Sequence, residues 1–183
     1  MGGRVVQKYV ENPLLLSRPK FDIRLWVLVT EWSPLEAFLY DDCYLRVCPR
    51  PFTLAESHFG DPDVHLTNLS KMMMRKRLLR AKRNLSEGWA RWVISDGQRA
   101  IGERLWKEKV LPSFEYIVRD TLVAAQSHVR PRAASFQLFG FDVLLDQELH
   151  PWLLEVNLSP ALSHTSNRRS GIIRSMCEGL LGL

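Results

Sequence analysis

The 183-residue sequence has few cysteines and no long run of uncharged apolar residues. Its cysteines, Cys43, Cys48 and Cys177, are odd in number and lack the close paired spacing of a zinc site. No window reaches the roughly eighteen apolar residues that a membrane-spanning helix needs. The opening MGGRVVQKYV also lacks the apolar segment of a signal peptide. We therefore expect reduced thiols, no membrane partner and a cytoplasmic location.

Apolar and aromatic residues, by contrast, are plentiful. Hydrophobic residues make up 46% of the chain, with six Trp and eight Phe among them. This is enough to bury a sizeable core, so we expect one compact domain or most of one. The formal net charge of +5 favours an acidic partner without identifying it.

The first part of the chain is dominated by strand patterns. Residues 20–32, KFDIRLWVLVTEW, alternate so that apolar side chains take one face while Lys20, Asp22 and Arg24 take the other. Taken alone, such a triplet is more typical of a solvated strand face with an internal salt bridge than of a binding site.

Two further strands and a loop are expected after this segment. Residues 36–48 predict two short strands around Asp41 and Asp42, with Arg46 on the second of them. Residues 64–68, VHLTN, predict the end of a strand that leads into a loop.

The middle of the chain changes character at Lys71. Residues 71–83 carry seven basic residues and no acid, which predicts a basic helix. Residues 89–129 are predicted to be mostly helical with a break near Pro112, and residues 168–183 predict a closing helix.

Residues 139–160 raise a specific question about charge. Two apolar runs flank a polar segment, which predicts a β-hairpin. If the turn is centred between residues 148 and 149, residue 145 faces residue 152 and Asp142 faces Glu155, with Asn157 one side-chain period further on. Like charges directly opposite each other in a sheet are unfavourable.

Three explanations compete for this carboxylate pair. The register can be wrong by a residue, which would turn one carboxylate to solvent. The two groups can share a proton for acid–base work. Alternatively, a divalent cation lies between them, and the oxygen-rich set of Asp142, Glu155 and Asn157 suits Mg²⁺, which usually shares its coordination shell with nucleotide phosphates.

Five blocks of sequence, in this order, carry a family resemblance: VVQKYVENPLLL, KFDIRLWVLVTEWSPL, LYDDCYLRV, HLTN and FQLFGFDVLLDQELHPWLLEVNLSPAL. Together they resemble the tubulin tyrosine ligase-like family of ATP-grasp ligases. The match is strongest at residues 5–68 and 135–161 and poor at 70–130. The resemblance implies an α+β fold for residues 1–183, the carboxy-terminal part of an ATP-grasp domain with a mainly antiparallel sheet and flanking helices.

The resemblance also implies a set of site residues for ATP and Mg²⁺. Its magnesium ligands match Asp142, Glu155 and Asn157, and Arg24 and Arg46 are expected beside the transferred phosphate and the acceptor carboxylate. The ATP contacts are expected at Gln7, Lys8, Val10 and Leu154 around the adenine, Lys20 and Asp22 near the ribose and phosphates, and His65, Thr67 and Asn68 on the γ-phosphate side. For a histidine such as His65 taken alone, a place in the core is the more usual role.

The implied reaction is ATP-dependent ligation of a free amino acid to glutamate side chains in acidic tubulin tails, through an acyl phosphate. We expect glutamate as the added amino acid, from HLTN and FGFDVLLD, with glycine as the alternative suggested by RLWVLVTEW. The expected location is the cytoskeleton, including cilium, flagellum and basal body.

Two departures from the family pattern matter. After HLTN the family continues with a lysine at a spacing that this chain does not keep, so Lys71 and Lys76 are both candidates. The family domain begins further upstream, so we expect a fragment with little ligase activity of its own. The alternative function is an inactive fragment that binds microtubules through the basic helix. An RNA-binding module is disfavoured, because no stacking platform accompanies the basic residues.

Overall fold

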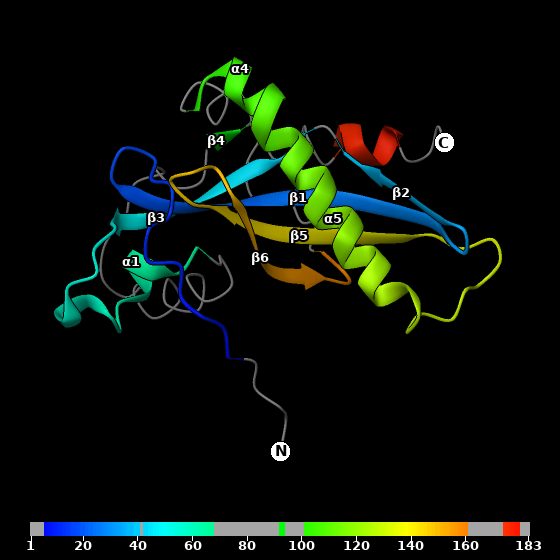
Figure 1. Cartoon of the computed structure of the whole chain (residues 1–183), viewed down its shortest axis with the longest axis horizontal. Helices are drawn as coiled ribbons and strands as arrows, with labels where there is room; N and C mark the ends of the chain where they lie inside the picture. Colours follow the sequence, from blue (N-terminus) through cyan, green and yellow to red (C-terminus); the bar gives the residue numbers. More distant parts are fainter. Residues whose placement is uncertain (1–5, 41, 68–91, 94–100, 161–173, 180–183) are drawn as a thin grey trace.

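The computed structural model describes residues 6–40, 42–67, 92–93, 101–160 and 174–179. They form an antiparallel sheet with flanking helices (Figure 1), which confirms the expected α+β class. The strands are β1 (Pro19–Trp32), β2 (Leu35–Leu39), β3 (Tyr44–Pro51), β4 (Trp92–Val93), β5 (Gln137–Leu145) and β6 (Pro151–Asn157). The helices are η1 (Glu56–His58), α1 (Pro62–His65), α4 (Glu103–Leu105), the π-helical η2 (Trp106–Val110) and α5 (Leu111–Gln126). A further helical segment covers residues 174–179.

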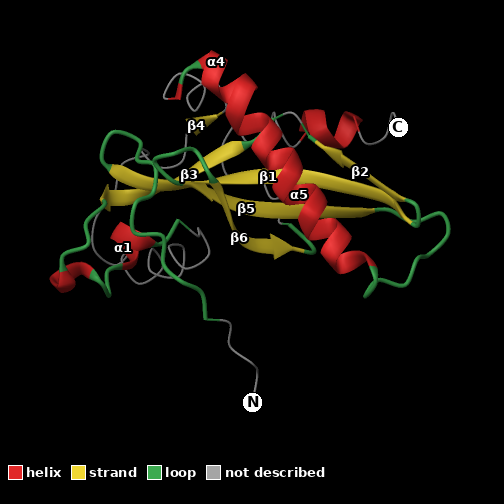
Figure 2. Cartoon of the chain, in the orientation of Figure 1, coloured by secondary structure: helices red, strands yellow, loops and turns green. Residues whose placement is uncertain are grey.

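The long strand β1 is the centre of the sheet. The strand order is β4-β3-β1-β5-β6, and β2 pairs with β1 as well (Figure 2). The first half of β1 pairs with β3 and its second half with β2, while β5 runs along its other edge. Both edges of β1 are thus paired, and most of its residues are buried.

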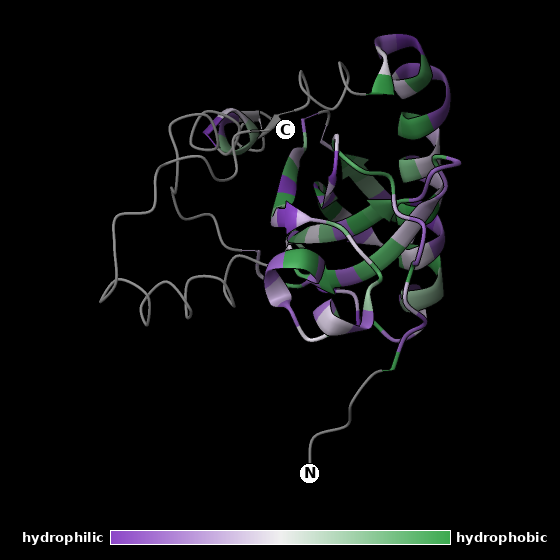
Figure 3. Ribbon diagram, turned by 90° about the vertical axis from the view of Figure 1, so that its left-hand side faces the viewer, coloured by the Kyte–Doolittle hydropathy of each residue, from purple (hydrophilic) through white to green (hydrophobic). Residues whose placement is uncertain are grey.

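One face of the sheet packs on α5 to form the main core. The apolar side chains of β1 alternate as predicted and face the helix side. Helix α5 contributes Phe114, Val118 and Leu122, which recur every four residues and so lie on one stripe. Figure 3 shows this helix beside the sheet. The other face of the sheet is therefore left to carry the even-numbered residues of β1.

Two local predictions are wrong. The described residues 64–67 do not end a strand: Pro62–His65 form the short helix α1, because Asp61 accepts a hydrogen bond from Asp63 N and Pro62 takes the first turn. The helical segment does not break at Pro112, which lies in the first turn of α5 directly after the π-helical η2. A wider π turn accommodates a residue that lacks an N–H group.

The predicted hairpin exists, with a different register at its turn. Leu145 pairs with Pro151 instead of residue 152, and Val143 pairs with Leu153. A β-bulge then shifts the register by one residue. As a result Asp142 does pair with Glu155, although the simple turn-based count fails near the turn.

Asp146 accounts for the tight turn itself. Its Oδ1 accepts hydrogen bonds from Glu148 N and His150 N, both at 2.9 Å, and its Oδ2 accepts one from Trp152 Nε1 at 2.9 Å. Leu149 takes a positive φ of 64°, a conformation that such a network stabilises.

None of the helices in the described ranges is long and apolar enough to cross a membrane. The basic segment 71–83 lies outside the described residues, as do Asp41 and most of the predicted closing helix.

Candidate active site

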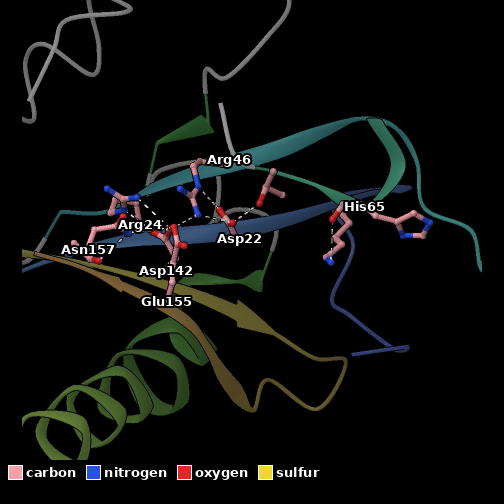
Figure 4. A network of polar contacts seen from close by, with 10 residues as sticks. Asp22, Arg24, Arg46, His65, Asp142, Glu155 and Asn157 are labelled. Atoms are coloured by element: carbon pink, nitrogen blue, oxygen red, sulfur yellow. Dashed lines mark hydrogen bonds and ion pairs between the residues drawn. The ribbon is translucent and has the colours of Figure 1, made fainter. Parts of the chain in front are cut away.

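A network of buried ion pairs joins three neighbouring strands on the face opposite α5 (Figure 4). Arg24 of β1 donates from Nε to Asp142 Oδ1 at 2.5 Å and from Nη2 to Oδ2 at 3.2 Å. Arg46 of β3 donates from Nε and Nη2 to the two oxygens of Asp22, both at 2.6 Å. The same Nη2 lies 2.8 Å from Asp142 Oδ2, so Arg46 bridges the two carboxylates. Thr67 donates its hydroxyl to Asp22 Oδ2.

The sheet register explains why these residues meet. Asp22 lies directly opposite Arg46 on β3, and Arg24 lies directly opposite Asp142 on β5. Because side chains alternate along a strand, residues 22 and 24 of β1 point to the same face. The first pairing joins residues 24 positions apart and the second joins residues 118 positions apart in the sequence.

The interpretation of Lys20, Asp22 and Arg24 as a solvated strand face is wrong. Their exposed fractions are 8%, 1% and 7%. A buried charge is tolerated when it is paired and hydrogen-bonded, and the bidentate arginine pairs meet that condition. The charges therefore belong to an organised site and not to a surface.

Glu155 and Asn157 of β6 extend this network. Asn157 Nδ2 lies 3.2 Å from Glu155 Oε1, 3.4 Å from Asp142 Oδ2 and 3.4 Å from Gly140 O. The first explanation for the carboxylate pair, a register that turns one group away, is therefore wrong. Asp142, Glu155 and Asn157 do converge.

The protonation of the two carboxyl groups differs. Burial would raise the pKa of Asp142, but the hydrogen bond from Arg24 and the charge of Arg46 outweigh it and hold that pKa below its usual range. The pKa of Glu155 is raised, first by its hydrogen bond with Asp142 and then by burial. The arginines thus stabilise the Asp142 carboxylate, and Glu155 is the group of the pair that retains a proton more readily.

The donor set fits a magnesium ion. In the described part of the chain no group of three or more His, Cys, Asp or Glu side chains could hold a metal ion. A magnesium site at Asp142 and Glu155 would use the Asn157 amide as a further ligand. A half-turn of the Asn157 amide exchanges Nδ2 for Oδ1 and directs an oxygen to both carboxylates. Two carboxylates, one amide oxygen and waters or phosphates are the ligands that Mg²⁺ prefers. A cation between the carboxylates would also offset the negative charge of Asp142, which is one of the smaller causes of the raised pKa of Glu155.

Gly140 makes room for the Arg24 side chain. A Cβ atom at this position would lie 2.8 Å from Arg24 Nη1 and 3.0 Å from Pro160 Cβ, both closer than ordinary contact. The guanidinium of Arg24 therefore passes through a gap that only glycine leaves open.

A second polar cluster lies on the same face, around Lys20. Its ammonium donates to Tyr9 Oη and to His65 O, both at 3.2 Å, and lies 4.6 Å from the centre of the Tyr9 ring. Tyr9 Oη is 2.7 Å from His65 Nδ1, and His65 Nε2 is 3.1 Å from His58 O. Burial lowers the pKa of Lys20, and burial raises the pKa of Tyr9 to about 12. The amino-terminal segment is thereby tied to β1 and α1.

The His65 ring is held in place by aromatic and hydrogen-bond contacts. Its ring meets the rings of Tyr9 and Phe52 edge to face, at centroid distances of 5.6 and 5.9 Å. Both ring nitrogens lie within hydrogen-bond distance of protein atoms, so the side chain is held from two sides.

The residues expected around adenine are only partly brought together. Gln7 Nε2 lies 3.4 Å from Leu154 O, so the amino-terminal segment does reach β6. Lys8 is instead an exposed residue paired with Glu11 at 3.6 Å. Val10 is half-buried. Asn68, Lys71 and Lys76 lie outside the described residues.

The comparison with known proteins now bears on this site. The model of the tubulin-tyrosine ligase family matches residues 2–182. The chain belongs to the tubulin-tyrosine ligase family.

Relatives within this family carry specific names. Tubulin monoglycylase TTLL3 of Danio rerio is 40% identical over 96% of the chain, which covers 22% of that protein. Tubulin glycylase 3E of Tetrahymena thermophila is 37% identical over 96% of the chain, covering 13% of the relative. Protein monoglycylase TTLL8 of Homo sapiens is 37% identical over 86% of the chain, covering 19% of the relative. The chain thus spans about a fifth or less of each of these family members.

Two residues that contact the candidate site, Tyr9 and Gly140, were not predicted from the sequence. Tyr9 lies within the segment that contains the predicted residues Gln7, Lys8 and Val10, yet it makes the contacts to Lys20 and His65. Gly140 interrupts an apolar strand pattern, and a glycine at such a place is a signal for the close approach of another group.

Proposed function

We propose that the described residues form the ATP- and magnesium-binding part of a ligase that adds glycine to glutamate side chains in tubulin tails. The observation that carries this proposal is the convergence of two arginines with Asp142, Glu155 and Asn157 on one face of a sheet. The names of the relatives support glycine, since all three described above are glycylases. The expectation of glutamate is not supported by these relatives.

Asp142, Glu155 and Asn157 would hold the magnesium ion, as their donor atoms fit it. When bound, Mg²⁺ supplies positive charge to the phosphate oxygens of the nucleotide. Lys20, Thr67, His65 and Asn68 are assigned to the phosphate side, with Asp22 positioning Arg46 and Thr67. Gln7, Lys8, Val10 and Leu154 are assigned to the adenine side.

Arg24 and Arg46 would stabilise charge as it develops. In the first step a carboxylate oxygen of the acceptor glutamate attacks the γ-phosphorus of ATP, ADP leaves, and an acyl phosphate forms. In the second step the glycine amino group attacks the acyl carbon, inorganic phosphate leaves, and the nitrogen loses a proton. Both steps need fixed cations beside the acceptor carboxylate and the phosphate.

The network suits the stabilisation of developing charge, because both arginines are already held in place before any substrate binds. Each guanidinium is clamped by two bonds to one carboxylate. Donors that are already oriented need no reorganisation during the reaction, which is the main source of electrostatic catalysis. Nη1 of Arg24 takes no part in the clamp to Asp142 and lies beside Gly140 and Pro160.

Ligation is best tested in a chimaera. The chain would replace the matching segment of the zebrafish monoglycylase, and incorporation of labelled glycine and labelled glutamate into tubulin would be measured. We expect glycine incorporation that is abolished by Arg46→Gln and retained by Arg104→Ser, a control arginine with an exposed ion pair on α4. Glutamate incorporation in place of glycine would contradict the amino-acid assignment, and loss of all ligation in a folded chimaera would contradict the proposed function.

A further inference from the structure

A groove of about 550 Å³ opens next to the site, where β5 begins and β6 ends. One wall is the connection from α5 to β5, with Arg130, Arg132 and Phe136. The other wall is the segment that follows β6, with Leu158 and Pro160, and Trp32 of β1 contributes as well. The groove is lined by three chain segments that are distant in the sequence.

Its lining combines positive charge with exposed apolar surface. Arg130 and Arg132 are exposed, and none of the residues that line the groove is acidic. Phe136 is 71% exposed and Leu158 is 65% exposed, although both are large apolar residues. The arginines have no carboxylate among the lining residues, so the groove favours an anionic ligand. The exposed apolar side chains favour a ligand that also has apolar groups between its charged groups.

One residue of the groove lining, Pro160, also borders the ion-pair network. Leu158, Ser159 and Pro160 directly follow Asn157 in the chain. Pro160 lines the groove and also lies against the position beside Gly140 that the Arg24 guanidinium occupies. A polypeptide that reaches the Arg24 guanidinium past Pro160 therefore also enters the groove.

We propose that this groove binds the acidic polypeptide that carries the acceptor glutamate, with Arg130 and Arg132 contacting flanking carboxylates and Phe136 and Leu158 contacting the carbon chain. This inference rests on the proposed function, because it assigns the path of that function's acceptor substrate. The groove and the nucleotide-binding residues then have different roles. The groove binds the acceptor polypeptide, and Arg24 contacts the glutamate side chain that is modified.

Binding can be measured without any chemistry. A fluorescein-labelled peptide of ten residues, glutamates with one central phenylalanine, would be titrated with the chain at low salt while fluorescence anisotropy is recorded. Replacing both Arg130 and Arg132 by Ser should weaken binding about five- to tenfold, the size of two exposed ion pairs, and the effect should shrink as salt rises. The matched control replaces Arg104 and Arg119 by Ser, since both are exposed arginines outside the groove and the change in net charge is the same.

Two further arms test the chemistry of the occupant. Phe136→Ser should weaken binding of this peptide by about threefold while hardly changing the binding of an all-glutamate peptide. If the matched control variant lost as much affinity, the effect would come from net charge alone, and the proposal that the groove binds the peptide would be wrong. Equal binding of an oligonucleotide of the same charge, lost with the same Arg130 and Arg132 substitutions, would overturn the assignment to an acidic polypeptide.

The outcomes distinguish this inference from the proposed function. If the chimaera ligates glycine but the Arg130 and Arg132 substitutions leave its KM for an acidic peptide unchanged, the groove is wrong and the function stands. If the peptide binds in the groove but no amino acid is incorporated by the folded chimaera, the groove stands as an acidic-peptide site and the ligase function is wrong.

Discussion

Replacing Gly140 by Ala should displace Arg24 without unfolding the protein. The added Cβ would lie 2.8 Å from Arg24 Nη1, whereas ordinary contact begins at 3.4 Å, so the guanidinium must move by about 0.6 Å. A shift of this size weakens the clamp that Nε and Nη2 of Arg24 make to Asp142. Weakening one charged hydrogen bond costs about 1 to 2 kcal/mol, and alanine regains about 0.5 to 1 kcal/mol of the conformational entropy that glycine loses in a strand. The net loss in the free energy of unfolding should therefore lie between about 0 and 1.5 kcal/mol.

The catalytic effect should be much larger than the effect on stability. A misplacement of about 1 Å in a catalytic group costs roughly a hundredfold in rate, so we expect kcat of the chimaera to fall about ten- to a hundredfold. Urea denaturation and steady-state glycine incorporation measure the two quantities. Gly60→Ala is the matched control, because a Cβ there meets no atom within 4 Å. Adding Pro160→Gly to Gly140→Ala removes the opposite wall and should restore part of the rate. Wild-type turnover in Gly140→Ala would refute the reasoning that this gap positions Arg24.

Three further predictions concern Tyr9, Asp146 and the basic segment 71–83. Tyr9→Phe should weaken Mg²⁺-ATP binding severalfold in calorimetry while the free energy of unfolding stays nearly unchanged, because only the hydroxyl that links Lys20 and His65 is removed; unchanged affinity would count against the linkage. The pKa of Asp146 is lowered in the fold: burial opposes this, and hydrogen bonds from Trp152 and two backbone N–H groups outweigh it. The ionised Asp146 side chain therefore stabilises the fold fully above the ordinary carboxyl pKa of about 3.9. This stabilisation is lost as the pH falls through the lower pKa of the folded state. Asp146→Asn should thus destabilise by about 1 to 2 kcal/mol at pH 7 and progressively less in acid, and an equal loss at every pH in urea denaturation would refute this. Changing three arginines of segment 71–83 to glutamate, Arg75, Arg77 and Arg80, should reduce microtubule co-sedimentation at low salt and leave Mg²⁺-ATP binding unchanged; undiminished co-sedimentation would leave the segment as a solvated surface.

The sequence predicts the strands of this fold well, because their alternation is local. The apolar residues of β1 lie on the face that packs against α5, as their spacing indicates. The pairing of β1 with both β3 and β5, however, cannot be predicted from any local sequence pattern. Without that pairing, Asp22, Arg24 and Arg46 resemble a solvated charged surface, and only the register shows that each faces an opposite charge.

The hairpin shows how a local count can fail and still give the right pair. The turn at Asp146 and the bulge that follows it each shift the register, and the two shifts cancel at Asp142 and Glu155. A bulge depends on how two strands twist against their neighbours, which a single strand pattern does not encode. Helix α1 is the opposite case, since Asp61 and Pro62 form a recognisable start signal that the strand interpretation of residues 64–68 overlooked.

The central claim is that Glu155 helps to hold a magnesium ion together with a nucleotide. Calorimetric titration of the chain with a non-hydrolysable ATP analogue, in Mg²⁺ and in excess EDTA, tests it directly against Glu155→Gln. The glutamine variant keeps the size of the side chain and removes one of two facing carboxyl groups, so its apo fold should be at least as stable at pH 7 as that of the unchanged chain. We predict that Mg²⁺ strengthens nucleotide binding at least tenfold in the unchanged chain, roughly 1.4 kcal/mol, and by less than twofold in the variant. The same magnesium dependence in both proteins would contradict the account.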